Sequence, residues 1–193
     1  MVWMESAAAV FGFLCVWLTV RQSLWCWPCG LVQVTIYLFV FYRARLYSDV
    51  ILHAVYVVLQ VYGWIHWRSG RGKSRELPVS SQAHWLSAAW AAAALLGTLL
   101  WGYLMATRTD AALPYWDAFI IAASLIAQWL MARKVLESWF FWMAVDVVAI
   151  GVYSVKELYL TTVLYALFLA LCVSGFRAWR RSRIASPAPA ESL

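Results

Sequence analysis

The strongest chemical signal in the sequence is a carboxylate that shares one helical face with aromatic rings. This face consists of Trp139, Trp142, Asp146 and Tyr153, spaced at i, i+3, i+7 and i+14. Asp146 lies near the middle of an apolar run, where a charged side chain costs roughly 2.5–3.5 kcal/mol on insertion scales. Aromatic rings stack on flat ligands, and a cation over Trp gains about 0.5–2 kcal/mol. The pattern therefore predicts a binding site for a flat, cationic organic molecule.

The alternative for this face is an interfacial belt of tryptophans plus a carboxylate that hydrogen-bonds to a neighbouring helix. It accounts for Trp139, which stands at the end of the apolar run. It accounts less well for Asp146, which is the only carboxylate in the centre of such a run.

A second polar and aromatic face precedes the first in the chain. It contains His53, Tyr56, Gln60, Trp64 and Trp67, spaced by 3, 4, 4 and 3 residues. Gln60 suits a hydrogen bond to an amide or a ribose, or else to a neighbouring helix. Trp67 is expected to be an interface anchor, and His53 to be structural rather than a proton relay. The remaining candidate ligands of the substrate are Gln33, Tyr37, Gln128 and Tyr165.

The composition requires a membrane around these residues. The chain has 193 residues, of which 65% are hydrophobic and 12% are charged, whereas soluble domains are typically about 45–50% apolar and 25% charged. The net charge of +6 does not indicate nucleic acid, because the basic residues form short clusters between apolar runs. We therefore expect an all-α polytopic membrane protein.

Apolar runs of about 20 residues suit transmembrane helices. Seven are predicted, over residues 5–20, 25–42, 46–67, 83–105, 114–132, 138–154 and 158–177. Seven spans place the termini on opposite sides, with four basic residues in the loops beside the N-terminus and eleven on the other side. Since basic loops stay in the cytoplasm, the N-terminus is predicted outside and the C-terminus inside.

The sequence also repeats itself. One constant shift of the chain against itself, without gaps, aligns Trp17 with Trp129, Arg21 with Arg133, Trp27 with Trp139, Gly63 with Gly175 and Trp67 with Trp179. Two parallel three-helix repeats are thus expected, over 5–67 and 114–180, related by an axis along the membrane normal. A cytoplasmic linker over 68–82 and an inversion linker helix over 83–105 would join them, and residues 184–193 are expected to be disordered.

No signal for catalysis accompanies these features. The sequence lacks HExxH and GxSxG motifs and has no His or Cys cluster with metal-ligand spacing. We therefore expect neither an enzyme nor a bound metal or cofactor.

Two motifs resemble a known family. The segment YGWIHW at 62–67 resembles the YGWxxW signature of the bacterial nicotinamide riboside transporter family (PnuC). The segment WFFWMAVD at 139–146 is similar to the WxxWxxxN/D motif of that family. The resemblance covers about residues 10–181, nearly the whole chain.

The resemblance implies a 3+1+3 fold like that of a full-length SWEET sugar transporter, assembled as a homotrimer in a bacterial inner membrane. It further implies facilitated diffusion of an unphosphorylated vitamin precursor, which a cytoplasmic kinase then traps. Where the nicotinamide riboside branch commonly has Asn, this chain has Gln33, Gln60 and Asp146. Thiamine therefore stays open as a second cationic substrate, with neutral riboflavin third. A non-transporting binding subunit and a membrane enzyme are the alternatives from other classes.

Overall fold

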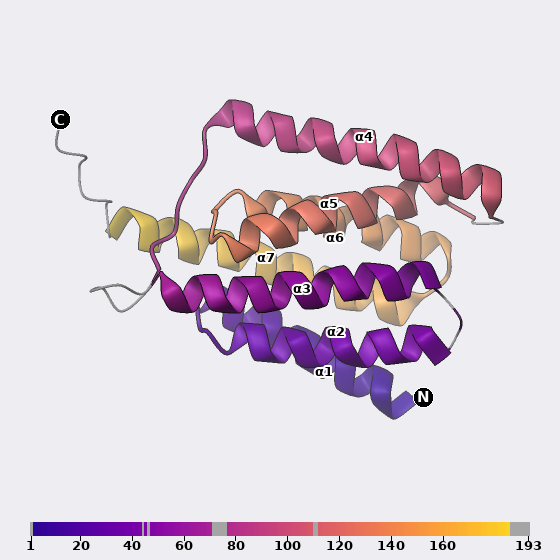
Figure 1. Ribbon diagram of the computed structural model, residues 1–193, viewed down its shortest axis with the longest axis horizontal. Coiled ribbons are helices and arrows are strands. Elements are labelled where there is room, and N and C mark those ends of the chain that lie inside the picture. Colours follow the sequence, from indigo (N-terminus) through magenta and orange to yellow (C-terminus); the bar gives the residue numbers. More distant parts are fainter. Residues whose placement is uncertain (1, 44, 46, 71–76, 110–111, 186–193) are drawn as a thin grey trace. The chain divides into compact units, whose positions relative to one another are not determined.

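The computed structural model describes residues 2–43, 45, 47–70, 77–109 and 112–185. Within these residues the regular secondary structure is helical, apart from one isolated β-bridge between Ser80 and Val135. The helices are α1 (Val2–Val20), α2 (Cys26–Arg43), α3 (Tyr47–Ser69), α4 (His84–Arg108), α5 (Pro114–Ala132), α6 (Ser138–Val155) and α7 (Tyr159–Ala185), as Figure 1 shows. The prediction of an all-α fold is confirmed. The centre of the predicted linker, 71–76, and the tail, 186–193, lie outside the described residues.

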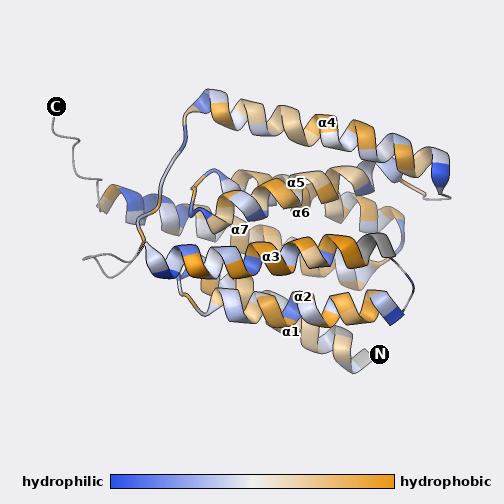
Figure 2. Ribbon diagram, viewed as in Figure 1, coloured by the Kyte–Doolittle hydropathy of each residue, from blue (hydrophilic) through white to orange (hydrophobic). Residues whose placement is uncertain are grey.

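Five of these helices are long and apolar enough to cross a membrane: α4, α5, α6, α7 and the part of α3 from Val50 to Ser69. In α1, the segment Ser6–Val20 is apolar but shorter. Hydrophobic residues fill the middle of the helices, and hydrophilic residues gather at several of their ends, such as the last turn of α3 (Figure 2). These helices agree with the predicted multi-pass membrane protein, although α1 and α2, the first two of the seven predicted spans, are not among the five.

The chain divides into two compact units. Unit 1 contains α1, α2, α3, the residues Ala132–Lys134 and the part of α7 that begins at Gly175. Unit 2 contains α4, most of α5, α6 and the first part of α7, within Ser80–Met131 and Val135–Ser174.

In unit 1, α2 packs against both α1 and α3. Two glycines allow α2 and α3 to come close, one on each helix. The indole of Trp27 on α2 fills the space beside Gly63, and the amide of Gln60 on α3 fills the space beside Gly30. Small residues at helix contacts are what membrane helices use to pack tightly, since lipid offers no hydrophobic driving force.

The Gly63→Ala substitution should therefore lower the thermal unfolding midpoint of the purified protein. The new Cβ would collide with three carbons of the Trp27 indole, which is itself held edge-on against Trp67 at 5.2 Å between ring centroids. Overpacking of this kind costs about 1–3 kcal/mol. The matched control is Gly151→Ala in α6, where an added Cβ meets nothing within 4 Å. Equal midpoints for the two variants would contradict this packing.

Two tryptophans of unit 1, which we call the clamp tryptophans, fasten helix ends to one another. The Nε1 of Trp67, near the end of α3, donates to the carbonyl of Ala132 at the end of α5, at 3.1 Å. The Nε1 of Trp179 in α7 donates to the carbonyl of Thr19 near the end of α1, at 3.0 Å. The two indoles lie 5.7 Å apart. Trp67, expected at the membrane interface, is instead buried, with 2% of its surface exposed.

Lys134 is buried beside this pair, although it follows α5 in a basic turn. Its side chain is 1% exposed, and its Nζ lies 4.8 Å from the centroid of Trp67. The ammonium also donates to the carbonyl of Leu77. A buried ammonium needs such partners, since leaving water without them is costly.

In unit 2 the segment before α4 is fastened to the turn between α5 and α6. The backbone N–H of Leu136 donates to the Ser80 carbonyl at 2.9 Å. The Glu137 carboxylate accepts from the Ser81 hydroxyl and, at 3.2 Å, from the Gln82 backbone N–H. These bonds fix the start of α6, the helix that carries the carboxylate described below.

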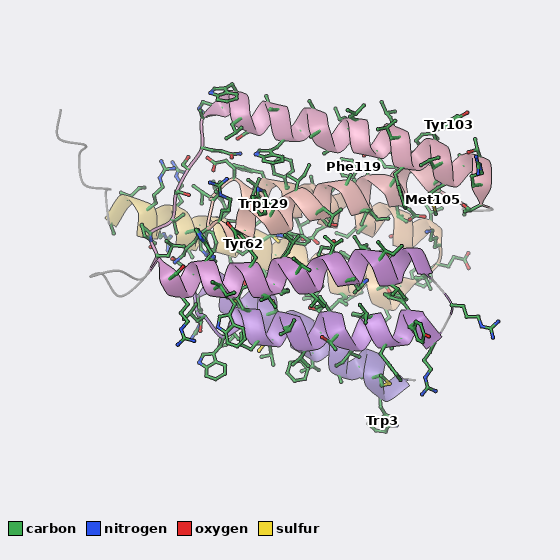
Figure 3. The ribbon with its side chains drawn as sticks, viewed as in Figure 1. Trp3, Tyr62, Tyr103, Met105, Phe119 and Trp129 are labelled. Atoms are coloured by element: carbon green, nitrogen blue, oxygen red, sulfur yellow. The ribbon has the colours of Figure 1, made fainter. Side chains whose placement is uncertain are left out.

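Large apolar side chains cover the outside of the helices. On α4 they include Trp85, Leu95, Leu96, Leu99, Leu100 and Tyr103. Figure 3 shows Tyr103 on α4 and Trp3 at the start of α1 projecting away from their helices. An apolar surface of this kind suits lipid rather than water.

Candidate functional site

Among the described residues of unit 2, the buried carboxylate is that of Asp146. It lies midway along α6, and the residue is 3% exposed. Its Oδ2 accepts a hydrogen bond from the Cys172 thiol of α7 at 3.3 Å. A thiol is a weak donor, so this carboxylate is buried with little to offset the loss of water.

No cation within the described residues faces Asp146. The ion pair that they form joins Lys156 to Asp117, with 3.0 Å between Nζ and Oδ2, and both side chains are 29% exposed. Asp117, in the first turn of α5, is thus already paired. A buried carboxylate without a cation is strongly unfavourable, and such a group inside a membrane indicates a functional site.

Aromatic rings accompany Asp146 on α6, as the spacing predicted. Trp139 is buried at the start of the helix, and Trp142 is half-buried. Towards the other end of α6, Tyr153 stacks on Tyr165 of α7 at 5.3 Å. Of these rings, Trp142 stands one helical turn before Asp146. A ring and a carboxylate at this spacing can stack on a flat ligand while balancing its charge.

Gln128 on α5 is buried in unit 2. A buried amide can be a ligand of the substrate or a group that packs between helices. No hydrogen bond between its amide and Asp146 is found among the described residues. Its role therefore stays a prediction.

Unit 1 holds a second set of polar candidates. Gln60 is 6% exposed, and its Oε1 is buried without a hydrogen-bond partner among the described residues. An unsatisfied buried acceptor calls for an explanation, because its desolvation costs about 1–3 kcal/mol. A ligand that donates an N–H or O–H would supply the missing bond.

The other candidate ligands predicted in unit 1 lie in three different places. Tyr37 and Tyr56 flank His53, with ring centroids 5.8 and 5.7 Å away. The Gln33 amide packs towards α1, where a Cβ on Gly12 would lie 2.6 Å from its Nε2. Trp64 is 37% exposed. The structure thus brings Tyr37 and Tyr56 together around His53, and it places Gln33 and Trp64 elsewhere on their helices.

The sequence did not reveal Cys172 as a member of the site. Thiols are common fillers of apolar helices, and only the fold places this one beside Asp146, 26 residues earlier in the chain. The constant shift that aligns Trp67 with Trp179 also aligns Cys172 with Gln60, a polar candidate of α3, and that correspondence is the signal that would have found it.

The described residues contain no group of three His, Cys, Asp or Glu side chains that could hold a metal ion. The polar candidates of each unit are amides and phenols, with a carboxylate in unit 2, and such groups suit hydrogen bonding and charge pairing with an organic ligand.

Three proteins with sequences similar to this chain are named as transporters. The nicotinamide riboside transporter PnuC of Escherichia coli (strain K12) is 23% identical, over 93% of this chain and 86% of the relative. PnuC of Neisseria mucosa is 30% identical, over 93% of this chain and 72% of the relative. The riboflavin/roseoflavin transporter RibM of Streptomyces davaonensis is 28% identical, over 92% and 84%.

A solved structure agrees with these relatives. The crystal structure of the vitamin B3 transporter PnuC matches with a TM-score of 0.76 at 26% identity, covering 95% of this chain and 83% of that one. The family model described as nicotinamide mononucleotide transporter matches residues 2–181. The resemblance predicted from the aromatic motifs is confirmed, and the chain belongs to the nicotinamide mononucleotide transporter family, which includes PnuC.

Proposed function

We propose that this protein transports nicotinamide riboside across the cell membrane. The observation that carries the proposal is the Asp146 carboxylate, which is buried on an aromatic helix face and has no cationic partner among the described residues. Nicotinamide riboside brings a flat pyridinium ring with a positive charge. The carboxylate would balance that charge, and the aromatic side chains would stack on the ring.

Unit 1, taken by itself, offers a separate polar group that a substrate could contact, the unsatisfied Oε1 of the Gln60 amide. Nicotinamide riboside carries a carboxamide and ribose hydroxyls, all of which can donate. The Oε1 of Gln60 can accept one of these hydrogens. A site built to bond such a group rejects analogues that lack it.

Thiamine is the second candidate, since its thiazolium ring is also flat and positively charged. Riboflavin is neutral and larger, and it would leave Asp146 without a counter-charge. The riboflavin/roseoflavin relative nonetheless keeps flavins among the ligands to be tested.

We further propose that transport is facilitated diffusion without ATP. Phosphorylation by a cytoplasmic kinase would then trap the substrate, and inward diffusion would continue. The test is uptake of labelled nicotinamide riboside by liposomes that contain only the purified protein. Saturable uptake without ATP, with unchanged product, is expected. Uptake that requires an added ATPase would instead indicate a binding subunit, and an altered product would indicate an enzyme.

The repeat belongs to the same proposal, as two parallel three-helix units over 5–67 and 114–180, with α4 as the linker helix. Backbone conformation supports it. The non-glycine residues with positive φ are Gln22 (55°), Arg45 (58°), Lys134 (56°) and Glu157 (57°). Such residues are uncommon, yet the shift that aligns the repeats pairs Gln22 with Lys134 and Arg45 with Glu157.

Ring contacts and tryptophan bonds support the repeat as well. The equivalent ring pairs are Phe41–His53 with Tyr153–Tyr165, and His53–Tyr56 with Tyr165–Phe168. The second two meet at 89° and 86°. Trp67 and Trp179, which occupy equivalent positions in the two repeats, each bond the end of the first helix of the other repeat. Parallel repeats suit alternating access around a central site.

We expect the N-terminus outside and the C-terminus in the cytoplasm, because the end of α7 carries Arg177, Arg180, Arg181 and Arg183. We also expect a homotrimer, which the family resemblance implies. Chemical cross-linking in membranes tests the oligomeric state.

A further inference from the structure

We propose that Cys172 is a positioning residue that makes the Asp146 site selective for positively charged ligands. The proposal rests on the function proposed above and deepens it. The thiol would hold one carboxylate oxygen in place and leave the negative charge available to the substrate. Cys172 itself is not expected to contact the ligand's charge.

The geometry places the thiol where it can act in this way. Asp146 and Cys172 belong to unit 2 and lie on different helices, α6 and α7, and both are buried, at 3% and 4% exposure. The thiol donates to Oδ2 at 3.3 Å, and it is the hydrogen-bond donor that the described residues give to this carboxylate. The bond therefore ties the orientation of the carboxylate on α6 to the backbone of α7.

The weakness of the donor explains the choice of residue. An Arg or Lys at this position would pair with the carboxylate, as Lys156 pairs with Asp117. It would then compete with a cationic substrate. An apolar residue would leave the carboxylate free to rotate. The substrate would then have to order the carboxylate when it binds, and the entropy cost of that ordering would weaken binding. A thiol restrains the carboxylate without adding charge.

The test compares two ligands that differ in charge. Nicotinamide riboside has a cationic pyridinium, whereas its reduced form has a neutral dihydropyridine ring on the same ribose. Dissociation constants of both are measured for the wild-type protein, Cys172→Ala, Cys172→Ser and Asp146→Asn. Cys29→Ala is the matched control, because this half-buried thiol of α2 belongs to unit 1, whereas Asp146 and Cys172 belong to unit 2.

Cys172→Ala should weaken binding of nicotinamide riboside about 3- to 10-fold, which corresponds to one hydrogen bond. Cys172→Ser keeps a donor and should stay within about twofold of the wild type. Binding of the neutral reduced form should change less than about twofold in either variant, and Cys29→Ala should change neither ligand. The unfolding midpoint is measured for each variant, and should Cys172→Ala fail to fold, Cys172→Val replaces it.

Three results would overturn the proposal. Unchanged affinity in Cys172→Ala would remove the role of the thiol, although Asp146→Asn would still report on the proposed function. Equal losses for the charged and neutral ligands would mean that Cys172 only fills space. A wild-type protein that binds nicotinamide riboside no better than its reduced form would refute the cation site, and with it both proposals.

Discussion

Replacing Asp146 with alanine should abolish measurable binding of nicotinamide riboside while the protein remains folded. The isosteric Asp146→Asn keeps the shape and removes the charge, and it should weaken binding at least about 30-fold, or about 2 kcal/mol. The reason is that Asp146 is the buried carboxylate among the described residues, whereas Asp117 is more exposed and is held by Lys156. Isothermal titration of the detergent-purified variants measures the effect.

Asp117→Asn is the matched control for this prediction. It removes a carboxylate of the same unit whose charge is already paired and which is more exposed. Surface-type ion pairs contribute about 0–1 kcal/mol, so affinity for nicotinamide riboside should stay within about twofold. Equal losses in the Asp146 and Asp117 variants would mean that the overall negative charge of the protein, rather than one carboxylate, attracts the substrate.

Truncating either clamp tryptophan should give the largest loss of stability. Trp67→Ala and Trp179→Ala each remove a buried indole and a hydrogen bond to a helix end. Removing a large buried aromatic side chain typically costs about 3–5 kcal/mol. We expect both variants to lower the thermal unfolding midpoint by similar amounts, because each removes a buried indole that donates one hydrogen bond near the end of another helix.

Two comparisons separate packing from hydrogen bonding at the clamp. Trp67→Phe keeps most of the ring and loses the donor, so its cost should be only about 0.5–1.5 kcal/mol beyond the small loss of volume. Trp64→Ala removes the same side chain from the same helix, but from a position that is 37% exposed, and it should have little effect. A Trp64 variant as unstable as the Trp67 variant would contradict the buried position of Trp67.

Helix positions followed from the sequence because apolar runs and their polar ends are local properties. The predicted spans 114–132 and 138–154 agree with α5 and α6 to within one residue at each end. The end of α7 was placed too early, at 177 instead of Ala185. Hydropathy reports the length that crosses the membrane, and a helix that continues into its arginine-rich end gives no apolar signal there.

Contacts between helices did not follow from the sequence. Periodicity placed Asp146 on an aromatic face, but it contained no information on which residue of α7 lies opposite, so Cys172 was missed. Lys134 resembled an ordinary loop cation, because its burial depends on Trp67 and Leu77, which lie far earlier in the chain. Such pairings are set by the packing of whole helices, which a single sequence does not encode locally.

The most direct test of the cation site is a titration of the purified protein monitored by its intrinsic tryptophan fluorescence. Nicotinamide riboside, thiamine and riboflavin are compared, with correction for ligand absorption, in the wild-type protein and in Asp146→Asn. Nicotinamide riboside should quench the fluorescence of the wild-type protein saturably, and this quenching should be lost in the variant. Saturable quenching only by riboflavin, or identical curves for nicotinamide riboside in the two proteins, would contradict the account.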